Sequence, residues 1–128
     1  MKQYSFLFLL VIGFILFTDL AQAQKKDDNV LETVRLFPYQ HRAEADSALT
    51  TMTGWGRSEW KSLFRLLDDD SLKASVADVL SAYVNAAALE TTRREQTAAL
   101  IIKYAPYATT NYARLFIRAQ LDLLTDRA

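Results

Sequence analysis

The fold is decided by residues 58–83, which read SEWKSLFRLLDDDSLKASVADVLSAY. Ahead of the three aspartates, large apolar residues recur at the i, i+3, i+4 and i+7 positions of one helical face. Beyond the aspartates, a second apolar series follows with a helical period. The two series are Trp60, Leu63, Phe64 and Leu67, then Leu72, Val76, Val79, Leu80 and Tyr83. We therefore predict two amphipathic helices, the first capped by Ser58, which are joined by a tight polar turn and pack antiparallel.

Two further helices are predicted before this pair. Asn29 and Glu32 form a capping-box pattern for a helix over residues 30–37, which Pro38 ends. A second helix is expected over about residues 39–53. Its predicted core-facing residues are Ala45, Ala48, Leu49 and Met52.

Two more helices are predicted after the central pair. Thr92 and Glu95 form a second capping-box pattern, and Pro106 ends the helix that they begin. Thr109 and Thr110 are positioned to cap a sixth helix. The predicted core-facing residues are Leu100, Ile101 and Tyr104 in the fifth helix, and Tyr112, Leu115, Phe116, Ala119 and Leu123 in the sixth.

The composition excludes several classes of protein. Lys plus Arg and Asp plus Glu both number 15, so there is no basic excess to neutralise phosphates, and we predict no nucleic-acid binding. The absence of cysteine removes disulfides, thiolate zinc sites and cysteine nucleophiles. Only 3 glycines and 2 prolines are present, too few for a many-turned β protein. We therefore predict a single all-α domain.

Residues 1–23 have the layout of a secretory signal peptide. Lys2 precedes an apolar run over residues 6–17, which is shorter than the ~20 residues that cross a bilayer as a helix. A small-x-small pattern follows at residues 21–23 and predicts cleavage after Ala23 or after Ala21. We expect export to the periplasm or the extracellular space, no stable membrane insertion after cleavage, and a mature helical domain over residues 24–128.

The helices recur at a spacing typical of helix-pair repeats. The predicted starts of the third and fifth helices, Ser58 and Thr92, lie 34 residues apart, and those of the fourth and sixth, Ser71 and Thr110, lie 39 apart. Such repeats have periods of roughly 34 to 47 residues, and each pair buries its apolar face against its neighbours.

Residues 63–80 resemble a HEAT-type repeat, with a Leu-rich first helix, an Asp-containing turn and a second helix that opens with an apolar and a basic residue. The opening residues are Leu72 and Lys73, and the small and large packing residues are Ala77 and Leu80. Residues 112–121 resemble the second helix of a following repeat. The resemblance implies a short HEAT-like array of about six helices in antiparallel pairs.

A signal peptide followed by such repeats is similar to the N-terminal region of secreted bacterial proteins that often carry a β-sandwich of the 3-keto-disaccharide hydrolase type. No part of this chain has the pattern of that β-sandwich. The resemblance therefore carries no catalytic residue over to this sequence.

Two groups of titratable residues are candidate metal sites. The run Asp68-Asp69-Asp70 lacks the central glycine and the final glutamate of a calcium loop, and carboxylates ahead of a helix are stabilised by its free amides. We expect the run to be a capping turn. His41 has Glu44 three residues later, and a single histidine with one glutamate is a poor transition-metal site.

No catalytic constellation follows from the remaining residues. Glu90 and Glu95 could form a glycosidase carboxylate pair, but their places at predicted helix starts are explained by capping. Neither a Gly-x-Ser-x-Gly elbow nor a Gly-rich phosphate loop is present. We expect no enzymatic activity, no cofactor and no metal.

Four residues are candidates for contact with a partner. Trp55 and Tyr107 fall on no apolar stripe; exposed aromatic residues bind sugars or anchor protein partners, although we favour a role in closing the ends of the helix pairs. Arg114 and Arg118 are one helical turn apart and place positive charge on an exposed face.

We expect an exported, non-catalytic helical-repeat scaffold or protein-interaction module that binds a protein partner or a following domain. The alternative is an N-terminal accessory segment of a secreted carbohydrate-active, glycoside hydrolase-like protein. Near the end of the sequence, Leu121, Leu123 and Leu124 are not followed by a polar capping helix, which repeat arrays need for solubility. This pattern predicts self-association through the C-terminal helix.

Overall fold

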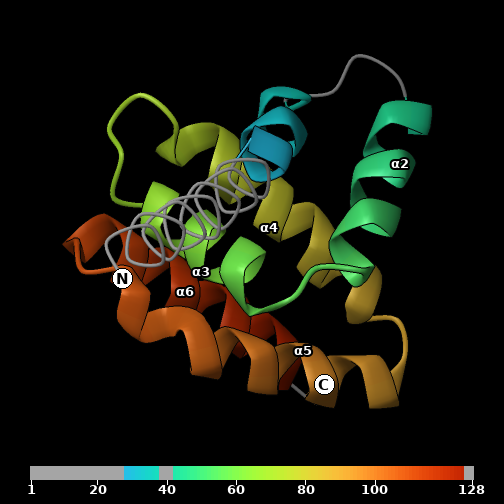
Figure 1. Ribbon diagram of the computed structural model, residues 1–128. Coiled ribbons are helices and arrows are strands. Elements are labelled where there is room, and N and C mark those ends of the chain that lie inside the picture. The colour runs from blue at the N-terminus through green and yellow to red at the C-terminus, as the bar shows by residue number, and fades with distance from the viewer. Residues whose placement is uncertain (1–27, 38–41, 126–128) are drawn as a thin grey trace, which may run out of the picture.

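The computed structural model describes residues 28–37 and 42–125, and these residues form helices and turns with no strand. A helical segment covers residues 28–35. It is followed by α2 (Arg42–Thr53), α3 (Arg57–Leu66), α4 (Lys73–Ala87), α5 (Thr91–Tyr104), the 3-10 turn η1 (Ala105–Tyr107) and α6 (Asn111–Thr125), as Figure 1 shows. The prediction of an all-α domain is thus confirmed for the described residues.

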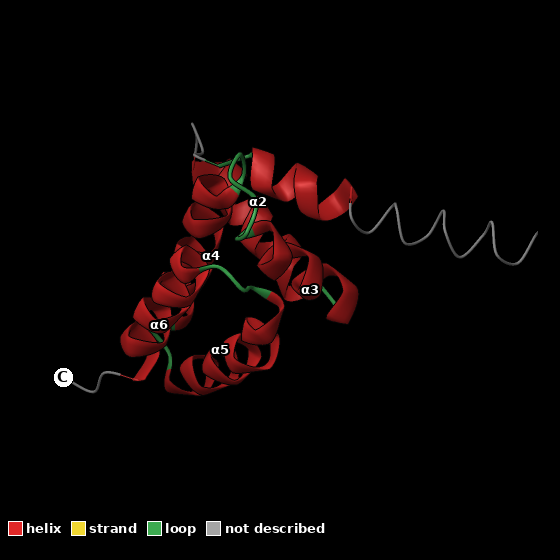
Figure 2. Ribbon diagram, turned by 90° about the vertical axis from the view of Figure 1, so that its left-hand side faces the viewer, coloured by secondary structure: helices red, strands yellow, loops and turns green. Residues whose placement is uncertain are grey.

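The last four helices pack in two neighbouring rows. α4 lies beside α6, and α3 contacts α5 (Figure 2). α5 packs along α6 and also contacts α4. η1 continues directly from α5 and contacts α3. α2 packs against α4.

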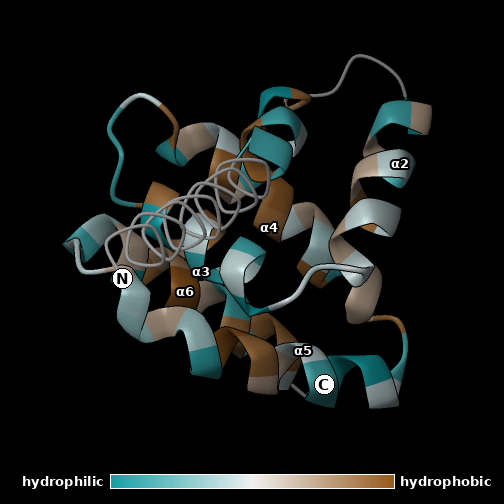
Figure 3. Cartoon of the chain, viewed as in Figure 1, coloured by the Kyte–Doolittle hydropathy of each residue, from teal (hydrophilic) through white to brown (hydrophobic). Residues whose placement is uncertain are grey.

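A single hydrophobic core runs through these contacts. The apolar stripe predicted for α3 is buried, and so are Val76, Val79 and Leu80 of α4. Hydrophobic residues of α4 accordingly lie in the interior of the molecule (Figure 3). The remaining buried apolar residues are Val30, Val34, Phe37, Ala45, Ala48, Met52, Val84, Ala87, Ile101, Tyr104, Ala108, Ala113, Ile117 and Leu124. The core faces predicted for α2, α3, α4 and α5 are therefore largely confirmed.

Four predicted helix starts are wrong: that of α4, Ser71, lies one residue before the N-cap Leu72, and three others lie too late in the chain. Asn29 lies inside the first helical segment, which ends at residue 35. The N-cap of α3 is Gly56 rather than Ser58, and Glu59 at the N3 position accepts a hydrogen bond from the Gly56 N–H at 3.1 Å. α5 begins at Thr91 after the N-cap Glu90, so Thr92 is not a cap. In these three cases the helix begins before the Ser, Thr or Asn that the pattern favours, since helix ends are set by packing as well as by capping.

The predicted core face of α6 is also wrong. Ala113, Ile117, Gln120 and Leu124 are buried, whereas Tyr112, Leu115, Ala119 and Leu123 are exposed and Phe116 is partly buried. Both sets have helical spacing because α6 carries apolar residues around most of its circumference. Periodicity therefore could not decide which set faces α4 and α5.

The leader, Pro38 and His41 lie outside the described residues. Within the described part of the chain, no helix combines the length and the apolar character needed to cross a membrane.

Candidate interaction surfaces

The turn between α3 and α4 anchors the start of α6. Both carboxylate oxygens of Asp68 accept hydrogen bonds from the backbone N–H and hydroxyl groups of Thr109 and Thr110, at 2.8 to 3.1 Å. The Thr110 hydroxyl in turn accepts the Ala113 N–H at 3.2 Å. Thr110 is therefore the side-chain cap of α6, as predicted, and Asp68 holds that cap from 42 residues away.

Burial by itself would raise the pKa of Asp68, but the hydrogen bonds from Thr110 and Thr109 outweigh it and lower the pKa below its ordinary value. The carboxylate is thus ionised where it meets the start of α6. Free N–H groups at a helix start favour a negative charge at this place.

The other two aspartates of the run form contacts at the connection between α3 and α4. Asp69 accepts hydrogen bonds from the N–H and the hydroxyl of Ser71, and Asp70 forms an ion pair with Lys73 at 3.4 Å. Within residues 28–37 and 42–125, no group of three His, Asp or Glu side chains is placed to hold a metal ion. The predicted capping of α4 by this run is therefore wrong: no side chain among the described residues caps α4, whose N-cap is Leu72, and Asp68 directs its contacts to the start of α6 instead.

A cluster of cations surrounds Tyr107, and we call Arg57, Lys61, Arg65 and Tyr107 the Tyr107 cluster. Arg57 Nη2 donates to the phenol oxygen at 3.4 Å. Lys61 Nζ and Arg65 Cζ lie over the ring, 5.1 and 5.7 Å from its centroid. The three cations come from α3 at i, i+4 and i+8, so they form one stripe along that helix.

The hydrogen bond from Arg57 lowers the pKa of Tyr107 below its ordinary value, and the charges of Arg57, Lys61 and Arg65 lower it further. The three cations placed around the ring make the electrostatic potential at the phenol oxygen positive, in agreement with the direction of this shift. This position therefore favours negative charge.

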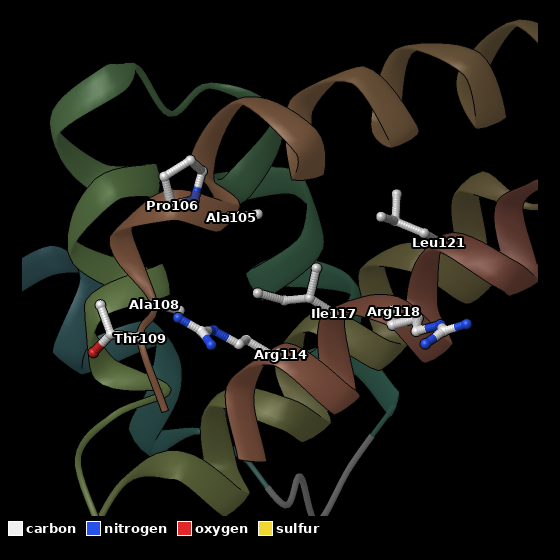
Figure 4. A pocket seen from close by; sticks show the side chains of 8 residues that line it. All are labelled: Ala105, Pro106, Ala108, Thr109, Arg114, Ile117, Arg118 and Leu121. Atoms are coloured by element: carbon white, nitrogen blue, oxygen red, sulfur yellow. The ribbon is translucent and has the colours of Figure 1, made fainter. Parts of the chain in front are cut away.

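Arg114 and Arg118 line one open groove between η1 and α6, with a volume of about 510 Å³. Arg114 extends toward Ala108 and Thr109, whereas the Arg118 guanidinium turns away from Arg114 (Figure 4). The full lining is Ala105, Pro106, Ala108, Thr109, Arg114, Ile117, Arg118 and Leu121. The groove is thus mainly apolar, with the two arginines as its charged groups.

Trp55 is the first of three aromatic rings in successive contact, of which the second belongs to α3 and the third to α4. Its ring meets that of Trp60 edge-on at 5.3 Å, and Trp60 meets Tyr83 at 5.2 Å in the same geometry. Trp55 is partly buried and packs against the core. These contacts are what a residue closing the end of a helix pair would make.

Of the four predicted contact residues, the structure brings only Arg114 and Arg118 into one groove. Tyr107 is next to two lining residues but packs on α3, and Trp55 packs on Trp60. The cations around Tyr107 and the anchoring role of Asp68 were not predicted. The i, i+4, i+8 spacing of the α3 cations was visible in the sequence, but nothing in it placed η1 beside them.

The exposed apolar residues of α6 form a stripe that we call the α6 stripe, consisting of Tyr112, Leu115, Ala119 and Leu123. Leu115 is 69% exposed and Leu123 is 53% exposed. At i, i+3, i+7 and i+11 these residues share one face of the helix. Lys73 contacts the Tyr112 ring, with its Nζ 5.0 Å from the ring centroid.

A comparison of the chain with protein-family models, with curated proteins and with solved structures finds no match.

Proposed function

We propose that this chain is an exported helical-repeat module that works by binding protein surfaces rather than by catalysis. The observation that carries the proposal is the α6 stripe, on which two large leucine side chains are more than half exposed on one helical face. Apolar residues gathered in this way mark interaction sites on soluble proteins more often than isolated exposed ones do.

The repeat architecture is supported by the contacts between helices. If α3 with α4 and α5 with α6 are successive pairs, a stack predicts that first helices touch first helices and second helices touch second helices. The contacts of α3 with α5 and of α4 with α6 fit this expectation. The Asp68 hydrogen bonds then join the turn of one pair to the second helix of the next.

The partner that the α6 stripe fits best is a second copy of the same chain. Two α6 helices crossing antiparallel at Ala119 would place Leu115 of each copy against Leu123 of the other. Arg114 and Arg118 would then flank Asp122 of the second copy, so that opposite charges meet beside the apolar contact. Twofold pairing of this kind is the commonest form of oligomer.

Sedimentation equilibrium over a range of protein concentrations tests the proposal. We expect reversible dimerisation of the wild type, and loss of the dimer when Leu115 and Leu123 are both changed to Glu, because each charge would have to be buried in the contact. Leu89→Glu is the matched control, since Leu89 is 86% exposed and lies outside α6. A wild type that stays monomeric, or a double variant that dimerises like the wild type, would contradict the proposal.

The export part of the proposal rests on the leader and is tested separately. The intact mass of the protein recovered outside the cytoplasm should correspond to a chain that begins at Gln24 or Gln22. Recovery of the uncleaved chain in the membrane fraction would count against it. An accessory role beside a carbohydrate-active domain is the alternative suggested by the resemblance, and no specific contact of the described residues favours it.

A further inference from the structure

The Tyr107 cluster places three positive charges around one neutral ring. Within the described residues, none of the three cations forms an ion pair with a carboxylate; the ion pair found there joins Lys73 to Asp70. Cation–π contacts with Tyr107 attract each cation but leave its charge in place. Residues four apart in a helix are about 6 Å apart along its axis, so the three cations repel one another across a small area.

A fourth cation lies beside the cluster. Lys103 Nζ is 5.5 Å from the centroid of the Tyr104 ring, and the Tyr104 and Tyr107 rings are 6.3 Å apart. α3 and α5 therefore both contribute positive charge around η1, although the whole chain has a formal net charge of zero. The positive potential that shifts the pKa of Tyr107 is a local property of this surface.

The cluster offers hydrogen-bond donors as well as charge. The Tyr107 oxygen accepts a hydrogen bond from Arg57, which leaves its own hydrogen free to be donated. The guanidinium groups of Arg57 and Arg65 present several N–H donors in a plane, and Lys61 supplies a compact charge between them. All four side chains can thus donate to an oxyanion.

We propose that the Tyr107 cluster binds the phosphate group of a ligand. A phosphate monoester carries about −1.5 to −2 charge at pH 7 with three acceptor oxygens, whereas a carboxylate carries one charge and two oxygens. Three cations converging on one ring match the group with the higher charge and the larger number of acceptor oxygens. This site is separate from the α6 stripe, so it adds a ligand to the proposed interaction function.

Titration of the purified protein with inorganic phosphate at constant ionic strength tests the site. We expect a rise in Tm that grows with phosphate concentration and exceeds the rise in matched sodium chloride. Changing Lys61 and Arg65 together to Met should weaken the apparent affinity by about tenfold or more, because two charge-assisted contacts are lost while the apolar stems remain. Changing Arg93 and Arg94 together to Met is the matched control, because Arg93 faces α2 and Arg94 donates to Thr91 at the start of α5, and it should leave the response unchanged.

A second variant keeps the test valid if the double substitution in α3 impairs folding. Tyr107→Phe retains the ring and its packing but removes the hydroxyl, and it should weaken the phosphate response while the far-UV circular dichroism stays that of the wild type. A response of Tyr107→Phe equal to that of the wild type would overturn the assignment of the hydroxyl to the site.

Vesicles distinguish the source of the phosphate. Co-sedimentation with phosphatidylcholine vesicles that contain phosphatidic acid, lost in the Lys61/Arg65 variant, would support a lipid phosphate as the ligand. A response to inorganic phosphate without vesicle binding would support a soluble one. The proposal is overturned if the wild type responds to neither, if the Lys61/Arg65 variant responds as the wild type does, or if polyglutamate binds as tightly as phosphate.

Discussion

At the scale of single residues, Asp68 does the most to join distant parts of the chain. Its carboxylate receives five hydrogen bonds from Thr109 and Thr110, and the Thr110 hydroxyl caps α6. The sequence predicted that the aspartate run would serve as a capping turn and that Thr110 would cap the sixth helix. It could not predict that the two would bond to each other, because that contact depends on how the helices stack.

Replacing Asp68 with asparagine should destabilise the fold by about 1 kcal/mol at neutral pH, the usual cost of losing a cap. The amide of the new side chain would offer a single acceptor oxygen and turn an N–H toward donors that need an acceptor. Chemical denaturation of the wild type and the variant would measure this loss of stability, with equal m-values showing that the two proteins unfold in the same way.

The pH dependence of stability tests whether the charge of Asp68 matters. Because folding lowers the pKa of Asp68, its contribution is fully present above the unfolded pKa and is lost as the pH falls through the folded pKa. The stability gap between the wild type and Asp68→Asn should therefore close on acidification. A gap that stays constant down to about pH 2, well below the ordinary pKa of an aspartate, would show that the ionised carboxylate is not what stabilises the contact.

Gln120 is the polar residue on the buried face of α6, and it is 7% exposed. Its Oε1 atom has no hydrogen-bond partner among the described residues. A buried polar atom without a partner costs about 1 to 3 kcal/mol. Gln120→Leu should therefore raise the Tm by several degrees in a scanning calorimetry measurement, and a lower Tm would mean that the amide is satisfied in solution.

At the scale of elements, the buried stripes of α3 and α4 were predictable because each helix has a single set of large apolar residues at helical spacing. The buried face of α6 could not be predicted, because two sets of apolar residues in this helix both have helical spacing. The small side chain of Ala113 is completely buried, whereas the larger Tyr112 and Leu115 stay outside. Close packing favours the face whose shape fits its neighbours, and a hydrophobic period does not encode shape.

The start of α3 provides a test at this scale. Trp60 is 3% exposed, whereas Trp55 is partly buried and contacts it edge-on. Acrylamide should therefore quench the fluorescence of the wild type in two components, and Trp55→Phe should leave only the protected one. If the remaining Trp60 signal in that variant were readily quenched, the packing at this end of the molecule would differ from that described.

At the scale of the whole molecule, the chain combines a continuous core with two outward-facing features, the α6 stripe and the Tyr107 cluster. Composition predicted the helical class, which the described residues confirm. It could not predict which residues make up the α6 stripe or the Tyr107 cluster. They arise from the choice of the buried face in α6 and from the place of η1 beside α3, and both are consequences of tertiary packing.

The claim that the α6 stripe is a contact surface is tested most directly by cross-linking, because the chain contains no cysteine. In the antiparallel arrangement the two copies of Ala119 meet at the twofold axis, so we predict rapid formation of a disulfide-linked dimer by Ala119→Cys under mild oxidation. Ala74→Cys, at an exposed position of α4, is the matched control and should remain monomeric. Equal cross-linking of the two variants, or none in either, would contradict the claim.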